Sequence, residues 1–138
     1  MKKDVPSPAR DSQRMESIYV GTKQSFYMSH DGGATWSRRG GNLPFGDFTS
    51  ILINPRNGDE VFVGNAYQPG EIGGGVYRTI NGGQTWARID PKEHRLPSQR
   101  IWALAFDSQD QNTLFVGSHS AGVYVVPRGA NSVSALSQ

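Results

Sequence analysis

Ser29-His30-Asp31-Gly32-Gly33-Ala34-Thr35-Trp36 occurs again, fifty residues later, as Thr79-Ile80-Asn81-Gly82-Gly83-Gln84-Thr85-Trp86. Both octapeptides have Ser or Thr first, Asp or Asn third, two glycines, and a final Thr-Trp. Agreement at six of eight positions is hard to obtain by chance. A period of roughly 20 to 50 residues is typical of repeat architectures, so the repeat comes before any other consideration of the fold.

The chemistry of each octapeptide predicts a tight hairpin turn. Asp31 or Asn81 followed by Gly-Gly lies between two apolar runs, and the glycines adopt positive φ at no steric cost. The Asx side chain can accept hydrogen bonds from backbone N–H groups that follow it. Thr35-Trp36 and Thr85-Trp86 are expected to open the next strand, and each Trp is large enough to pack against a neighbouring repeat. The motif is thus mainly structural, although contact with a ligand stays open.

The two octapeptides resemble the Asp-box, or BNR repeat, of β-propellers. It occurs in sialidases, sortilin-type receptors, xyloglucanases and the photosystem II stability/assembly factor family. The resemblance implies a turn between the third and fourth strands of a blade, on the face away from the active site. It implies a blade type and not one function. The matching residues are Ser29, Asp31, Gly32, Gly33, Thr35 and Trp36, and then Thr79, Asn81, Gly82, Gly83, Thr85 and Trp86.

A second echo extends the repeat to three copies. An apolar-aromatic-Val-Gly pattern occurs at residues 18–21, 61–64 and 114–117, and each copy is followed by a strand-like run at 25–28, 75–78 or 122–125. The third copy should then show its box. There, Arg128 stands in place of the acid and Val133 in place of Trp. We interpret this segment as a decayed box, and the resemblance covers about residues 16 to 136.

Short apolar runs at 48–53 and 101–106 suit first strands that are buried on both faces. The equivalent N-terminal segment contains Pro6 and Pro8, which cannot donate to a central ladder, so this strand is expected to be eroded, at an edge or absent. The expected fold is all-β, with about three four-stranded antiparallel β-propeller blades and the first blade incomplete. The expected division is residues 1–15 as an eroded strand or flexible arm, and 16–47, 48–100 and 101–138 as blades 1, 2 and 3.

Composition narrows the function classes. The chain has 138 residues, 17 glycines, 36% hydrophobic residues and no Cys, which fits many short strands without disulfides or Cys-based metal sites. Three scattered His residues lack metal-ligand spacing, so no metal or cofactor is expected. A net charge of +2 without a basic cluster argues against nucleic acid. No apolar stretch approaches a membrane span and no signal peptide is evident, so the default compartment is the cytoplasm, or the exterior for a fragment of a secreted protein.

Three blades are too few to close a ring, because propellers typically have about four to eight. Open sheet edges invite pairing with another chain. We therefore expect a homo-oligomer, for example two chains of three blades, or a piece of a longer propeller.

A binding site is expected in loops opposite the boxes. The loop at 65–74 is longer than its equivalents, and the loop at 90–99 holds acid, imidazole and cations. The candidate ligand-binding residues are Lys23, Tyr67, Glu71, His94, Arg95 and His119.

Two functions remain open for this chain. The first is a non-catalytic propeller module that binds a protein or glycan. The alternative is part of a sialidase- or xyloglucanase-like glycoside hydrolase, for which the candidate acids are Asp47, Glu71, Asp90 and Glu93. Most glycosidases need two carboxylates at a defined separation, and no motif pairs these four. No catalytic residue is therefore assigned, and binding is the preferred function.

Overall fold

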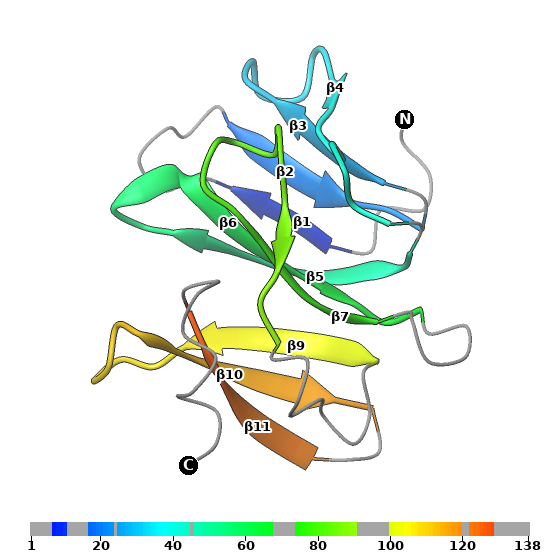
Figure 1. Cartoon of the computed structure of the whole chain (residues 1–138). Helices are drawn as coiled ribbons and strands as arrows, with labels where there is room; N and C mark the ends of the chain where they lie inside the picture. Colours follow the sequence, from blue (N-terminus) through cyan, green and yellow to red (C-terminus); the bar gives the residue numbers. More distant parts are fainter. Residues whose placement is uncertain are drawn as a thin grey trace.

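The computed structural model describes residues 17–23, 25–44, 46–67, 74–90, 100–119 and 122–128, and the backbone of residues 7–10. These residues form strands and turns, and none of them forms a helix that is long and apolar enough to cross a membrane. The strands make three antiparallel sheets, which lie one beside the next in chain order (Figure 1). The expected all-β class is confirmed.

The first sheet contains four strands in sequential order: β1 (Ser7–Arg10), β2 (Ile18–Gly21), β3 (Phe26–Ser29) and β4 (Ser37–Arg38). Its first strand is short, with four residues where β5 has seven. Strand β1 lies at the edge of the sheet, where Pro8 is tolerated because its missing N–H is not needed by an inner ladder. This agrees with the expectation of an incomplete first blade.

The second sheet repeats that order with β5 (Phe48–Asn54), β6 (Asn57–Asn65), β7 (Gly75–Thr79) and β8 (Ala87–Arg88). The third consists, in the described residues, of β9 (Ile101–Phe106), β10 (Thr113–Ser118) and β11 (Gly122–Pro127). The first strands of the three sheets adjoin one another, since β5 contacts both β1 and β9.

Alternation along β6 explains how the sheets pack. Val61 and Val63 point toward the first sheet and join a cluster with Tyr19, Phe26 and Trp86. The residue between the two valines, Phe62, points the other way and packs with Ile101, Leu114 and Val116 of the third sheet. Because side chains alternate with a period of two, one strand supplies both cores. The second sheet is thus the central layer of the molecule.

Two local expectations need correction. The fourth strands were predicted to open with Thr35-Trp36 and Thr85-Trp86. They begin two residues later, at Ser37 and Ala87, because the Thr and Trp side chains bond back into the turn. Strand β9 was expected to be buried on both faces. Only its inner face is covered, because no described sheet lies beyond the third.

Candidate functional site

The first box is a turn whose side chains bond within it. The Ser29 hydroxyl donates to Asp31 Oδ1 at 2.7 Å, and the Gly33 N–H donates to Ser29 Oγ at 2.9 Å. The N–H of Thr35 donates to Asp31 Oδ1 at 2.8 Å, and its hydroxyl donates to Asp31 Oδ2 at 2.6 Å. Hydrogen bonds from the Thr35 side chain, the Thr35 backbone and Ser29 lower the pKa of Asp31 to about 2.

The second box has the same geometry with an amide in place of the carboxylate. Thr79 Oγ1 donates to Asn81 Oδ1 at 2.8 Å, and the Thr85 N–H donates to the same oxygen at 3.0 Å. Asn81 Nδ2 donates to Thr85 Oγ1, which reverses the direction of the bond seen between Thr35 and Asp31. The glycines take positive φ as expected, at 69° and 100° in the first turn and 69° and 90° in the second. Both turns therefore use their polar side chains to hold their own backbone.

The two box tryptophans differ in what they contact. Trp86 packs edge-on against Phe26 of the first sheet with ring centroids 5.0 Å apart, and its Nε1 donates to the Arg39 carbonyl at 3.0 Å. Asn42 completes the link: Nδ2 donates to the Trp86 carbonyl, and Oδ1 accepts the Trp86 N–H at 2.7 Å. Trp36 is only partly buried, with Nε1 bonded to the Gly33 carbonyl in its own turn. The second box thus fastens its sheet to the preceding one.

The predicted ligand-binding residues are placed only in part. Lys23, Tyr67 and His119 are exposed and follow β2, β6 and β10, which puts them at the same end of the sheets in three separate loops. The ring of His119 lies 6.0 Å from that of Trp102. Glu71, His94 and Arg95 lie outside the described residues. The described residues contain no group of three or more acidic or imidazole side chains that could hold a metal ion.

Asp90, one of the candidate acids for glycoside hydrolysis, has a structural role. The Asp90 carboxylate is buried, pairs with Arg88 Nε at 2.9 Å, and accepts the Val76 N–H at 3.0 Å. Its oxygens therefore hold the end of β7 beside β8. Glu71 and Glu93 lie outside the described residues.

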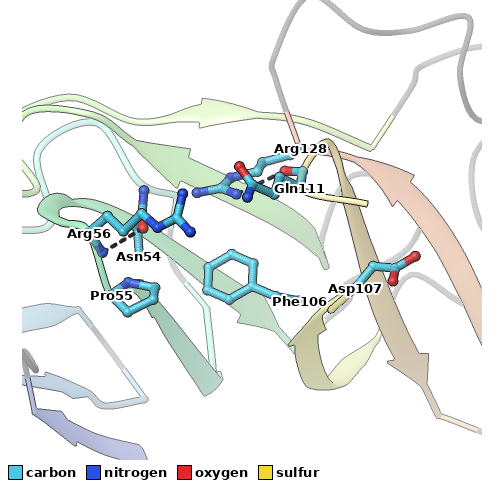
Figure 2. A pocket seen from close by; sticks show the side chains of 7 residues that line it. All are labelled: Asn54, Pro55, Arg56, Phe106, Asp107, Gln111 and Arg128. Carbon is cyan, nitrogen blue, oxygen red and sulfur yellow. Dashed lines mark hydrogen bonds between the residues drawn. The ribbon is translucent and has the colours of Figure 1, made fainter. Parts of the chain in front are cut away.

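A surface pocket lies at the other end of the sheets, where the boxes are. It has a volume of about 170 Å³ and is lined by the β5–β6 turn, the β9–β10 loop and the residue after β11 (Figure 2). The Gly82 N–H donates to the carbonyl of Asp59 at 3.1 Å, which places the start of β6, just after the β5–β6 turn, beside the second box. The lining residues are Asn54, Pro55, Arg56, Phe106, Asp107, Gln111 and Arg128.

Arg128, which stands in place of the box acid, joins the third sheet to the second. Its Nη2 lies 2.7 Å from Glu60 Oε1, and its guanidinium lies over the Phe106 ring at 4.8 Å. Arg78 and Asn54 bond to the same carboxylate at 2.7 Å each. Burial raises the pKa of Glu60, but the hydrogen bonds from Arg128, Arg78 and Asn54 outweigh burial and hold this pKa below its ordinary value.

Sequence reasoning missed Glu60 and this pocket. The one available signal was Arg128 itself, a cation where the repeat has an acid. Its partner lies 68 residues away, and no local pattern marks Glu60.

The outer face of the third sheet forms an exposed apolar surface. Phe115 is 39% exposed, Val125 44% and Val123 71%. Ala103 and Ala105, also exposed, lie opposite Gly117 and Phe115 in the ladder. We call the surface formed by Ala103, Ala105, Phe115, Val123 and Val125 the outer apolar face. A monomeric protein rarely leaves such residues contiguous without an interaction to make.

Solved structures with the same arrangement are propellers. The chain aligns with an ancestral GH74 enzyme at a TM-score of 0.71 and 21% identity, over 91% of this chain and 17% of that one. YCF48 from Cyanidioschyzon merolae aligns at a TM-score of 0.67 and 19% identity, over 96% of this chain and 40% of that one. YCF48 bound to D1 peptide aligns at a TM-score of 0.64 and 18% identity, over 96% of this chain and 39% of that one. The three sheets are β-propeller blades.

The blades cover less than half of each of these proteins. Neither a protein-family model nor a curated protein matches the sequence. At identities of 18–21%, the similarity to these structures is a similarity of fold alone.

Proposed function

We propose that this chain is a non-catalytic propeller module of three blades, residues 16–47 with the edge strand β1 before them, 48–100 and 101–138, and that its third blade packs against a further blade. The further blade comes from a second copy of the chain or from the rest of a longer propeller. The observation that carries this proposal is the outer apolar face, compared with the equivalent faces of the first two blades.

Equivalent residues are buried in every blade that has a following neighbour. Tyr19, Phe62 and Phe115 hold the same place in the apolar-aromatic-Val-Gly pattern. Tyr19 and Phe62 are fully buried by the next sheet, whereas Phe115 is exposed. The same holds one strand later, where Phe26 and Val76 are fully buried and Val123 is the most exposed of the large apolar residues in the described ranges. The third blade therefore exposes the surface that, in each of the first two blades, is covered by the blade that follows.

The glycine of the pattern leads to the same conclusion. A Cβ on Gly21 would lie 2.6 Å from the Phe48 carbonyl oxygen, and one on Gly64 would lie 2.5 Å from Ser50 Oγ of its own sheet and 2.6 Å from the Ile101 side chain. Phe48 and Ile101 both belong to the first strand of the next sheet. At Gly117 the nearest atom is Ala103 in its own sheet, at 3.4 Å. At Gly117, therefore, no described sheet makes the close approach that the next sheet makes at Gly21 and Gly64.

The first blade offers a complementary surface. Trp36 holds the place of Trp86, which fastens the second blade to the first, and Trp36 has no preceding blade among the described residues. A head-to-tail contact between two copies would bring Trp36 of one beside the outer apolar face of the other. Such a contact is heterologous, and it closes into a ring when the rotation permits.

A protein partner is also supported by one of the similar structures, since YCF48 was solved bound to D1 peptide. The GH74 likeness keeps the alternative of a glycoside hydrolase fragment. Hydrolysis of xyloglucan or a sialoside by this chain, lost in Glu71→Gln or Glu93→Gln, would favour that alternative.

The proposal is tested by the mass of the assembled chain. We expect the wild type to associate in analytical ultracentrifugation as concentration rises, and Val123→Asp to weaken this association at least tenfold, because it places a charge in the apolar contact. Ile80→Asp is the matched control, since Ile80 is 62% exposed on a box turn away from this face. A cooperatively folded wild-type monomer at all concentrations, or equal effects of the two variants, would refute self-assembly.

A further inference from the structure

We propose that the pocket at the box end of the blades binds an oxyanion, a carboxylate or phosphate group carried by a small ligand. This site is separate from the outer apolar face. It is built by two guanidinium groups, those of Arg56 and Arg128, above an apolar floor formed by Pro55 and Phe106. In Figure 2 the two guanidiniums point toward one another above the Phe106 ring.

Arg56 has guanidinium N–H donors that no acid of the described residues pairs with. Its backbone N–H donates to Asn54 Oδ1 at 2.9 Å, which shapes the turn. Its exposed guanidinium makes no ion pair with an acid of the described residues. A guanidinium offers five N–H donors in a planar fork that fits carboxylate and phosphate oxygens. Arg56 can therefore direct several donors at a ligand.

Arg128 is held in place and still has donors left. Nη2 pairs with Glu60, Nη1 donates to the Gln111 carbonyl at 2.8 Å, and the guanidinium lies over Phe106. These contacts use one N–H of each terminal nitrogen and fix the side chain before any ligand arrives. A preorganised donor loses less side-chain entropy on binding.

The charges around the pocket favour an anion. Glu60 is shared by Arg78 and Arg128, so one carboxylate faces two guanidiniums. The carboxylate of Asp107 points away from Arg56 and Arg128 in Figure 2, and its Oδ1 accepts the Gln109 N–H at 2.8 Å. Arg56 thus adds a positive charge opposite Arg128 that no acid of the described residues pairs with. Two like charges that face one another across a small pocket are relieved by an anion between them.

The apolar floor limits which ligands fit. Phe106 and Pro55 offer no hydrogen-bond donor to an anion, so the oxyanion must bond to the arginines above them. A flat apolar group attached to the oxyanion can rest on the Phe106 ring. The pocket of about 170 Å³ holds a small ligand and not a long chain.

The test is an amide-resolved NMR titration of the whole chain at constant ionic strength. Sodium phosphate, sodium acetate and sodium chloride are the three titrants. We expect saturable shifts at the amides of Asn54, Arg56 and residues 106–111 with phosphate or acetate and none with chloride. The tighter of the two binders identifies the oxyanion class.

Variants separate the pocket from general attraction to a cationic surface. Arg56→Gln should weaken binding about tenfold, and Arg56→Lys should weaken it less, because a charge remains without the planar fork. Arg38→Gln is the matched control, since it removes the same charge. Arg38 is exposed on β4 and lies outside the pocket. Unchanged resonances elsewhere will show that each variant is folded. Absent shifts at the pocket, equal shifts with chloride, or equal losses in Arg56→Gln and Arg38→Gln would overturn the proposal.

Discussion

At the residue scale, Asp31 and Asn81 show that one turn accepts two chemistries. Each accepts the N–H of the Thr four residues later, and each bonds to that residue's hydroxyl. The carboxylate can only accept, so Thr35 donates to it, whereas the amide donates to Thr85. Because the hydroxyl can rotate, the turn keeps its shape through this reversal.

Asp31→Asn should therefore preserve the turn and remove part of the acid sensitivity. Since the folded pKa of Asp31 is about 2 against an ordinary 3.8, its stabilisation is complete above pH 3.8 and is lost as pH falls toward 2. We expect the free energy of unfolding of the variant to depend less on pH between 4 and 2 than that of the wild type. Urea titrations followed by tryptophan fluorescence measure this, with Asn81→Asp as the reciprocal control. Parallel decline of wild type and Asp31→Asn would contradict it.

At the element scale, Glu60 ties β6 to β7 through Arg78 and ties the second blade to the third through Arg128. A nearly buried carboxylate is stable here because three hydrogen-bond donors surround it. The same contacts keep its pKa low. The stabilisation is therefore present above the ordinary pKa of 4.5 and is lost as pH falls through the lower folded pKa.

Glu60→Gln should lower the free energy of unfolding by about 1–3 kcal/mol at pH 7, because Arg78 and Arg128 lose a charged acceptor in a partly buried place. Denaturant unfolding measures this loss. Arg56→Gln is the control, since it lines the same pocket without bonding to Glu60. A double-mutant cycle with Arg128→Gln should show coupling between the two side chains. Additive losses would show that the ion pair contributes nothing.

At the scale of the whole molecule, the three blades have different surroundings although their sequences repeat. The central blade has a neighbour on both faces, the first lacks a described blade before it, and the third lacks one after it. The same substitution at the same motif position should therefore lower the free energy of unfolding by different amounts in different blades.

The two tryptophans test this directly. Trp86→Ala should cost about 3–5 kcal/mol, because it empties the contact between the first and second blades. Trp36→Ala should cost less than about 1 kcal/mol, because partly exposed side chains away from a core contribute little. Both are to be measured by denaturant unfolding in the Val123→Asp background, so that association does not contribute. Equal losses would show that blade position does not matter.

The sequence by itself determined the box turns, the strand order within each blade and the number of repeats. These depend on residues close together in the chain: the Ser or Thr before the turn, Asx-Gly-Gly, and the Thr four positions after the Asx supply the hydrogen bonds that hold the turn. The unbroken apolar run Val61-Phe62-Val63 likewise predicts a strand that is packed on both faces, because successive side chains of a strand point to opposite faces.

Only the tertiary structure decided what the faces meet. Glu60 and Arg128, 68 residues apart, become partners because the second and third blades stack, and Arg56 comes to face Arg128 for the same reason. Phe115 and Phe62 have equivalent sequence surroundings, yet one is exposed and the other buried, because burial depends on whether another sheet follows. Local sequence specifies a turn through short-range hydrogen bonds, whereas contacts between sheets depend on positions that only packing brings together.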